Sequence, residues 1–461
     1  MVKMDRRDFL KGTTAGAVSS RVLNASQPAV RSRSSNYMGG YAAAKIPLIR
    51  AAFIGMGNRG PTHLRFFSQL AGTEVVGISD LVELHATKEL GRLKSIDPHR
   101  HQEVRIYHGQ EDGWRRMLKE TKPDVVFIST NWSNHAPMAI ATMRSGAHAF
   151  VEVPLATTIA DLWNIVDTAE ATGLHCMMME NVNYGRDELL FLNMCRQGAI
   201  GSILHGEAAY IHELRWQMQE DSIELGTGSW RTGHYARRNG NLYPTHGLGP
   251  IAQYMSLARG EDQFESITSV STPALGRTAY ATKHFEAEHK WNQLNFRGGD
   301  LNTSIVRSRL GRSILIQWDE TSPRPYTRLN LIQGTKGALA GFPTRVALEG
   351  GVLDISEDHH SWVQGDYLHD VYEKWDHPLY RRLSEVTIGS GHGGMDGMMM
   401  YRIVECLQQG LPLDQNVYEG CLWSAVAPLS ERSVASGGAP QQFPDFTRGD
   451  WVDTAPLAVV A

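Results

Sequence analysis

The stretch "AAFIGMGNRGPTHLRFF", residues 51–67, joins an apolar run to a helical pattern through a glycine-rich turn. Gly55, Gly57 and Gly60 have the spacing G-x-G-x-x-G at this predicted junction between a strand and a helix. The first two glycines permit a tight turn and a close approach of the backbone to a pyrophosphate, and the third lets the helix pack on the strand. The start of the helix adds N–H donors and a positive dipole end. This stretch therefore predicts a dinucleotide-binding turn.

Asp80 ends the second predicted strand, about 20 residues beyond the glycines, where a carboxylate can accept hydrogen bonds from ribose hydroxyls. The same carboxylate would repel a 2′-phosphate, so the pattern favours NAD over NADP. Met56, Asn58 and Arg59 complete the turn as predicted cofactor contacts, and Arg59 keeps NADP open as an alternative. A second alternative is a simple glycine turn followed by an Asp that caps a helix.

The alternation of apolar runs and amphipathic segments continues through residues 46–180 and predicts a Rossmann fold, a doubly wound parallel sheet with right-handed crossovers. The later strands are expected in "TEVVGISD" (73–80), "PDVVFIST" (123–130), "HAFVEVPLA" (148–156) and "HCMMMENVNY" (175–184).

Residues 181–461 have a different texture, rich in β-type segments such as "ILHGEAAYIHELRW" (203–216) and "RSILIQWDET" (312–321). They predict a C-terminal α/β domain with a large, mostly antiparallel sheet that is open on one face, which makes a homo-oligomer plausible. The turn "GTKG" (334–337) predicts a hairpin, and "GGMDGMMMYRIVECLQQG" (393–410) predicts a helix that ends at Gly410. Its methionines are interpreted as core filler.

The composition is that of an ordinary soluble globular protein, with 461 residues, 42% hydrophobic residues and a net charge of −4. The chain has no basic stripe of the kind that binds nucleic acid, and no apolar stretch of about 18 residues that would span a membrane. The four cysteines lack C-x-x-C spacing and are interpreted as buried thiols. No H-E-x-x-H or similar ligand cluster occurs, so no metal site is predicted.

The N-terminal stretch "MDRRDFLKGTTAGAVSS" (4–20) places Arg6 and Arg7 just before Phe9, Leu10 and Lys11. This pattern predicts a twin-arginine export signal and a periplasmic location, with residues 1–45 forming the signal and a linker. The alternative is a disordered basic tail.

The segment "DVVFISTNWSNHAPMAIATMRSGAHAFVEVPLATT" (124–158) resembles the Gfo/Idh/MocA oxidoreductase family. In that family the lysine of an E-K-P motif often serves in catalysis, and a downstream D-x-x-x-H motif supplies an acid–base pair. Here Val153 replaces the lysine, and Leu242 lies four residues before His246. These departures weigh against a plain sugar dehydrogenase.

A narrower resemblance covers nearly the whole chain after residue 45. "MGNRG" (56–60), "EVPLATT" (152–158), "MMMENVNYGR" (177–186), "WRTGHYARRNGNLYPTHGLGPIAQYM" (230–255) and the stretch 410–449 resemble the NAD-dependent α-N-acetylgalactosaminidases of glycoside hydrolase family 109. The resemblance implies hydrolysis of terminal α-N-acetylgalactosamine by transient oxidation at sugar C3, elimination, water addition and re-reduction, so that NAD is not consumed. Two alternatives remain: an NAD-dependent sugar dehydrogenase, or a non-catalytic sugar-binding protein that retains NAD.

The motif "YPTH" (243–246) supplies the candidate catalytic residues, Tyr243 and His246. Histidine exchanges protons near neutral pH, and a tyrosine three positions earlier reaches the same pocket if the segment enters a helix. Which of the two is the acid and which the base stays open. The predicted sugar contacts are Tyr184, Tyr210, Arg231, Tyr243, Pro244, Thr245, His246 and Tyr326. Further cofactor contacts are expected at strand ends, at Trp132, Asn134, His135, Glu152, Val153 and Asn181.

Overall fold

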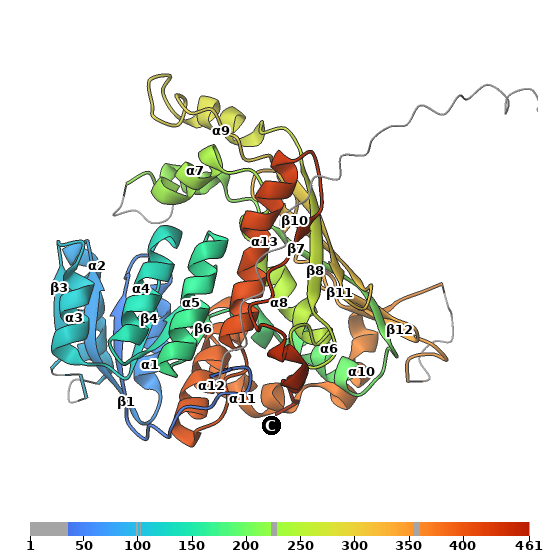
Figure 1. Cartoon of the computed structure of the whole chain (residues 1–461), viewed down its shortest axis with the longest axis horizontal. Coiled ribbons are helices and arrows are strands. Elements are labelled where there is room, and N and C mark those ends of the chain that lie inside the picture. Colours follow the sequence, from blue (N-terminus) through green and yellow to red (C-terminus); the bar gives the residue numbers. More distant parts are fainter. Residues whose placement is uncertain (1–35, 98–99, 102, 223–227, 354–359, 461) are drawn as a thin grey trace, which may run out of the picture. The chain divides into compact units, whose positions relative to one another are not determined.

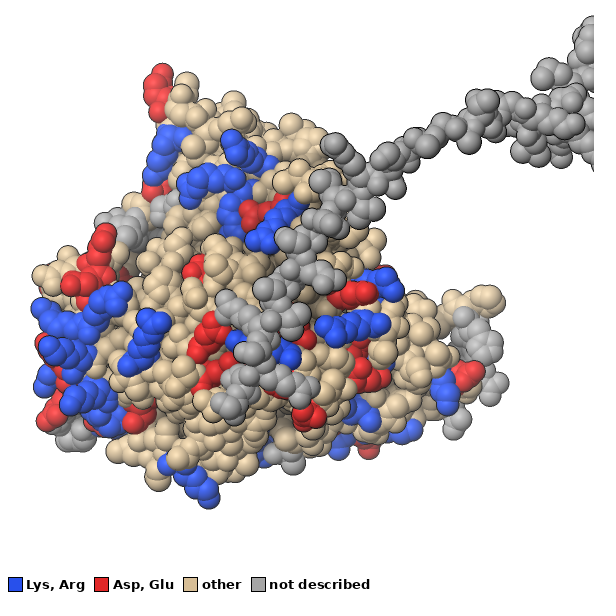
Figure 2. All heavy atoms as spheres, in the orientation of Figure 1, with Lys and Arg blue, Asp and Glu red and all other residues tan. Residues whose placement is uncertain are grey.

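The computed structural model describes residues 36–97, 100–101, 103–222, 228–353 and 360–460. The twin-arginine stretch lies outside the described residues. The described part of the chain belongs to one compact unit. Among its helices, none is both long and apolar enough to cross a membrane. Figure 2 shows basic side chains scattered among acidic and neutral ones on the face drawn there.

The first sheet has six parallel strands in the order β3-β2-β1-β4-β5-β6. This order reverses between β1 and β4, which confirms the predicted doubly wound fold. The strands are β1 (Ile49–Ile54), β2 (Thr73–Asp80), β3 (Arg105–His108), β4 (Val125–Ile128), β5 (His148–Val151) and β6 (Cys176–Met178). The last strand is shorter than expected, because the chain after Glu180 turns into the short 3₁₀ helix η1 (Asn181–Tyr184), in which the Glu180 side chain accepts from the Val182 N–H.

Five helices connect these strands: α1 (Gly60–Gln69), α2 (Glu83–Ile96), α3 (Gly113–Thr121), α4 (Trp132–Arg144) and α5 (Ile159–Thr172). Two helices from the end of the chain complete the cover of the first sheet, as Figure 1 shows: α12 (Met395–Gln409) packs on α1, and α13 (Val417–Ala435) packs on α5. Met398, Met399 and Met400 of α12 are buried in the core that contains Phe53 and Phe127. The methionines are therefore core filler, as predicted, and α12 ends before Gly410, also as predicted.

The second sheet has nine strands in the order β14-β13-β12-β11-β7-β10-β9-β8-β15, mostly antiparallel, with β7 and β10 parallel. The "GTKG" hairpin is confirmed, because Gly334 pairs with Gly337. The strands are β7 (Ile203–Ile211), β8 (Phe264–Ser271), β9 (Leu301–Ser308), β10 (Ser313–Asp319), β11 (Leu331–Gly334), β12 (Gly337–Ala340), β13 (Arg345–Leu348), β14 (Val363–Gln364) and β15 (Gln441–Gln442).

Helices α8 and α13 pack on this sheet, against β7 and β8 respectively. Other side chains of the sheet are exposed, such as Val270 (59%) and Ile305 (55%), so part of it is open, and self-association through it stays a prediction. The other helices of this part are α6 (Arg186–Arg196), α7 (Gly228–Arg237), α8 (Thr245–Tyr254), α9 (Gly276–His284), α10 (His369–Trp375) and α11 (Pro378–Thr387), with the 3₁₀ turns η2 (Arg215–Gln219), η3 (Gly365–Leu368), η4 (His392–Gly394) and η5 (Asp450–Asp453).

Gly247 allows helix α8 to lie close against strand β7. A Cβ atom on Gly247 would overlap the backbone of Ala209 in β7, so only glycine permits this close approach of helix and strand. The first turn of α8, which carries His246, is thereby held beside Tyr210 of β7.

Candidate active site

A cavity of about 990 Å³ lies at the carboxyl ends of the first sheet's strands. Its volume is at the upper end of the ~300–1,000 Å³ typical of small-molecule sites. The glycine turn and Asp80 line one part of it, and Tyr210, Arg231, Tyr243 and His246 line another. One cavity thus brings together the predicted dinucleotide turn and the predicted catalytic pair.

The three glycines of the turn have three different roles. Gly55 has a φ of +90°, and a Cβ there would lie 2.5 Å from the Ser129 carbonyl oxygen. A Cβ on Gly60 would overlap the Gly55 carbonyl, whereas Gly57 lines the cavity and a Cβ there would meet nothing within 4 Å. Any side chain at Gly57 would take up cavity space in front of α1, whose first turn has no side-chain cap. This cradle fits a pyrophosphate.

The Asp80 carboxylate is hydrogen-bonded to the backbone of two nearby segments. Its carboxylate accepts from the backbone N–H of Met56 at 2.5 Å and from that of Val82 at 2.8 Å, so it holds the glycine turn and the start of α2 in place. Carboxylate oxygens have further lone pairs, and Asp80 also lines the cavity. It can therefore still accept from ribose hydroxyls.

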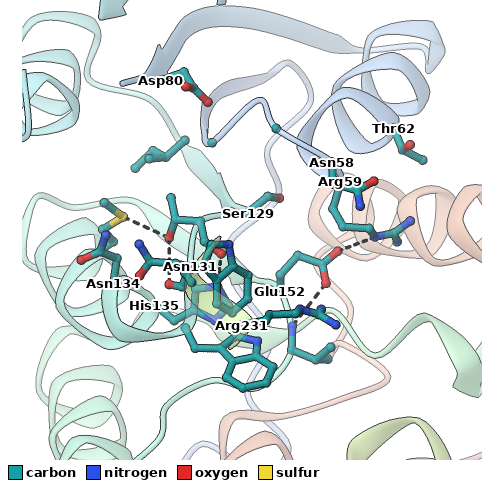
Figure 3. A pocket seen from close by; sticks show the side chains of 18 of the residues that line it. Asn58, Arg59, Thr62, Asp80, Ser129, Asn131, Asn134, His135, Glu152 and Arg231 are labelled. Atoms are coloured by element: carbon teal, nitrogen blue, oxygen red, sulfur yellow. Dashed lines mark hydrogen bonds and ion pairs between the residues drawn. The ribbon is translucent and has the colours of Figure 1, made fainter. Parts of the chain in front are cut away.

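Arg59 is turned away from Asp80 and towards Glu152 (Figure 3). Its Nε lies 3.1 Å from the Glu152 carboxylate, and its two terminal nitrogens lie 3.0 and 2.8 Å from the carboxylate of Asp396. Burial opposes the charge on Arg59, but Glu152 and Asp396 raise its pKa above the ordinary value. A guanidinium held by two carboxylates is not a free ligand for a 2′-phosphate, which argues against the NADP alternative.

Glu152 and Asp396 form the acidic side of this network. Burial would raise the pKa of Glu152, but Arg59 and His63 hold it below the ordinary value. For Asp396, His392 and Arg59 likewise overcome the effect of burial and lower the pKa. Asp396, from α12, was not predicted. The only sequence signal was the proximity of His392 and Asp396 in "HGGMDG" (392–397), which does not point to Arg59, 337 residues away.

The predicted catalytic pair is assembled at the start of α8. The hydroxyl of Tyr243 lies 3.4 Å from Nε2 of His246, so the segment does enter a helix that brings both residues to one place. Nδ1 of His246 lies 2.6 Å from a carboxylate oxygen of Glu180, which is fully buried. This contact puts the proton on Nδ1 and leaves Nε2 to face Tyr243 and the cavity. Burial raises the pKa of Tyr243, so its hydroxyl keeps its proton at neutral pH.

Glu180 was not predicted to be a functional residue, although it lies inside the quoted stretch "MMMENVNYGR" (177–186). The signal that could have indicated it is an acid just after β6, at the edge of the sheet where the cavity opens. The D-x-x-x-H motif predicts the acidic partner of His246 at position 242, which is Leu in this chain. The fold supplies the carboxylate partner of His246 from a different element.

Aromatic rings surround the guanidinium of Arg231. Its central carbon lies 5.4, 5.3 and 5.2 Å from the ring centres of Trp132, Trp230 and Tyr243. Its Nε is buried without a hydrogen-bond partner among the described residues. Trp132, expected beside the cofactor, thus contacts Arg231 and Tyr243, two of the residues predicted to bind the sugar. Tyr210 completes this wall, with its ring 4.8 Å from that of Tyr243.

Several predicted sugar contacts lie elsewhere. Tyr184 is buried with its hydroxyl 3.2 Å from Asp414 and does not line the cavity, so we correct its assignment to a structural residue. Tyr326 does not line the cavity either, but its ring lies 6.2 Å from that of Tyr210. Pro244 and Thr245 cap and begin α8 and position the residues on either side of them.

The remaining predicted cofactor residues, Asn58, Asn134, His135, Val153 and Asn181, line the cavity. Met56 does not line it, but its backbone N–H binds Asp80. His135 is fixed in place because its two ring nitrogens lie 2.7 and 3.0 Å from the carbonyl oxygens of Pro154 and Thr130. Sequence reasoning did not single out several other lining residues, namely His212, Leu214, Trp216, Gln217 and Trp230.

His369, Asp370 and Glu373 are close enough to share an ion, but all three are exposed on α10 and none lines the cavity. The absence of a metal from the reaction stays a prediction.

Comparison with known proteins identifies the family. Residues 184–453 match the C-terminal domain of glycosyl hydrolase 109, and residues 49–180 match the oxidoreductase family with an NAD-binding Rossmann fold. The chain is 56% identical over 426 residues to glycosyl hydrolase family 109 protein 1 of Akkermansia muciniphila, covering 92% of this chain and 87% of that protein. The chain belongs to glycosyl hydrolase family 109. This family 109 protein is also 49% identical over 467 residues to the alpha-N-acetylgalactosaminidase of Shewanella oneidensis, with both chains fully covered.

Solved structures share the fold of this family 109 protein at low sequence identity. Levoglucosan dehydrogenase in complex with NADH and levoglucosan has a TM-score of 0.62 at 18% identity, covering 86% of this chain and 99% of that one. An NAD-binding oxidoreductase from Klebsiella pneumoniae has a TM-score of 0.63 at 17% identity, with the same coverage. The predicted relation to oxidoreductases, the glycoside hydrolase family and NAD as the cofactor are thus confirmed.

Proposed function

We propose that this protein removes terminal α-N-acetylgalactosamine from glycans by transient oxidation at sugar C3, elimination of the aglycone, water addition and re-reduction. One observation carries the proposal: Tyr243 and His246 line the same cavity as the dinucleotide turn, and the buried Glu180 holds His246 from behind. The name of the relative that is 49% identical over its full length supports the choice of sugar.

NAD, when bound, supplies the redox chemistry by accepting a hydride from C3 and returning it after hydrolysis. The C3 ketone makes the proton on C2 acidic, and a base must remove it. His246 is suited to this step, because its Nε2 carries no proton and can accept one. Its Nδ1 keeps its own proton and donates it in the hydrogen bond to Glu180. The charge of the buried Glu180 carboxylate then stabilises the imidazolium.

Elimination breaks the bond between C1 and the leaving oxygen, which must receive a proton. Tyr243 is the proposed donor because burial keeps its hydroxyl protonated. Its contact with His246 Nε2 provides a route for the proton removed from C2 to reach Tyr243. Water then adds its oxygen to C1, and C2 regains a proton, so the cycle is balanced.

Arg231 is the proposed anchor for the sugar's hydroxyl and acetamido oxygens. Its guanidinium has donors in a fixed planar arrangement, and no ion pair to a carboxylate is observed for it among the described residues. The rings of Trp132, Trp230 and Tyr210 offer apolar faces to the C–H surface of the sugar.

Incubation of the purified protein with p-nitrophenyl α-N-acetylgalactosaminide, without added NAD, tests the proposal. Release of nitrophenol without net NADH, together with solvent deuterium at C2 of the product, is the expected result. Growth of the NADH absorbance band with free sugars would identify a sugar dehydrogenase instead. Neither signal, with NAD and sugar still bound, would identify a non-catalytic binding protein.

We also propose that the twin-arginine signal exports the protein to the periplasm. The expected result is that Arg6→Lys together with Arg7→Lys leaves the protein in the cytoplasmic fraction, because the pathway reads the arginine pair. Equal periplasmic amounts of both forms would contradict this proposal.

A further inference from the structure

The carboxylate of Asp396 joins three segments that are distant in sequence. It accepts from the two terminal nitrogens of Arg59 at 3.0 and 2.8 Å, from Asn181 Nδ2 at 2.7 Å and from His392 Nδ1 at 2.9 Å. The Asp396 side chain is fully buried. The carboxylate therefore ties the start of α12 to the dinucleotide turn and to η1 at the same time.

The segment that leads into α12 is folded tightly around this carboxylate. Ser390 Oγ lies 3.1 Å from both the Gly394 carbonyl and the Gly397 N–H, which closes the segment on itself. A Cβ on Gly391 would overlap the Asp396 carboxylate and approach Thr62 of α1 to 3.5 Å. Residues 390–397 thus form one compact unit seated against α1.

This unit forms part of the cavity wall, because Gly391, His392 and Asp396 all line the cavity together with Gly57 and Asn58 of the turn. The C-terminal part of the chain therefore borders the place where the diphosphate fits. Arg59 is the link, since its backbone belongs to the turn while its side chain is held from α12.

We propose that Asp396 is a positioning residue for the dinucleotide, and that the contacts of its carboxylate with Arg59, Asn181 and His392 keep NAD bound between turnovers. The chemistry favours this role, because a cofactor that is reduced and reoxidised in each cycle must not leave in its reduced form. Separation of the turn from the wall formed by residues 390–397 would widen the cavity beside the turn, and four hydrogen bonds to one buried carboxylate oppose that movement. No direct contact between Asp396 and the cofactor is required.

The test measures the rate at which NAD leaves the purified holoprotein when an excess of an NAD analogue is added. Asp396→Asn keeps the size of the side chain but removes its charge. We expect release at least about tenfold faster, since hydrogen bonds to a charged group are stronger than those to a neutral one. The apparent affinity of Asp396→Asn for NAD is expected to fall as well.

Asp414→Asn is the matched control. Asp414 holds Arg402 of the same helix with two hydrogen bonds of 2.9 and 2.8 Å, but it does not line the cavity. This variant is expected to lower the melting temperature without changing the release rate. Equal acceleration in both variants would mean that loosening α12 anywhere releases NAD, and would overturn the proposal.

A second variant keeps the proposal testable if Asp396→Asn does not fold. His392 has an exposed side chain, so His392→Ala should fold while removing one of the donors to Asp396. A modest rise in the release rate is expected, and wild-type release would contradict the proposal. The measurement does not depend on the sugar substrate, so failure of the glycosidase proposal and failure of this one are distinguishable.

Discussion

The two ends of the cavity differ in whether their arginine is paired with carboxylates. At the cofactor end, Arg59 is paired with Glu152 and Asp396, so charged groups satisfy one another inside the protein. At the end proposed to bind the sugar, Arg231 lies among aromatic rings, and its Nε has no hydrogen-bond partner in the part of the chain that the structure describes. The difference teaches how one cavity can hold one ligand and exchange another. The ion pairs of Arg59 fix the cavity wall in the shape that a permanently bound cofactor needs. The guanidinium of Arg231 keeps a donor available for a substrate that binds and leaves in each cycle.

The sharpest test of this division is His246→Ala. We expect kcat to fall by a factor of about 10²–10⁴, the usual contribution of a general acid or base, with no change in bound NAD. Turnover with the nitrophenyl substrate and NAD content after gel filtration check both parts. Loss of NAD in this variant would mean that the two ends do not act independently.

Glu180→Gln removes the charge behind His246 while keeping the shape of the side chain. We expect kcat to fall about 10- to 100-fold, since a charged hydrogen bond contributes ~1.5–3 kcal/mol, with little change in KM. Glu419→Gln is the matched control, because Glu419 is an equally buried glutamate that pairs with Arg259 away from the cavity. If both variants lost turnover equally, Glu180 would be structural only.

Asp80→Ala addresses the cofactor end directly. It removes the acceptor for the Met56 and Val82 N–H groups and for the ribose, so we expect NAD to bind about 10- to 100-fold more weakly. Isothermal titration with NAD measures the change, and turnover at saturating NAD should stay near the wild-type value. A variant that kept its NAD but lost turnover would reverse the two assignments.

The pH dependence of the melting temperature tests the ion pairs of Glu152 and Asp396 at the cofactor end of the cavity. The folded-state pKa values of Glu152 and Asp396 are lowered from their ordinary 4.5 and 3.8, chiefly by Arg59 with His63 and His392, which overcome the effect of burial. Their contribution to stability is therefore present above these ordinary values and is lost as the pH falls below them. Melting temperatures measured from pH 7 down to about pH 2 should fall less for Asp396→Asn than for the wild type, with the difference developing below about pH 4. Parallel curves would contradict the assigned shift.

The smallest effect is expected at Tyr326, whose side chain is 41% exposed and outside the cavity lining. Tyr326→Phe removes the hydroxyl that accepts from Arg328, and we expect KM to change by no more than about twofold, as for most exposed groups. Steady-state kinetics check this. A tenfold rise in KM would place Tyr326 in direct contact with the sugar.

The sequence by itself determined the parts of the protein that depend on local patterns. Glycine spacing and an acid at a strand end sufficed for the Rossmann fold and for NAD, because turn geometry and strand periodicity involve neighbouring residues. The pairing of Tyr243 with His246 was also predictable, since three residues span one helical turn.

Only the tertiary structure decided which distant side chains meet. Glu180 reaches His246 across 66 residues, and Asp396 reaches Arg59 across 337, and neither pair has a characteristic spacing in the sequence. The predicted role of Tyr184 in sugar binding was likewise corrected by the structure, because its hydroxyl is hydrogen-bonded to Asp414 and the residue does not line the cavity. The physical reason is that these contacts depend on how helices pack on the sheets, which no short stretch of residues encodes.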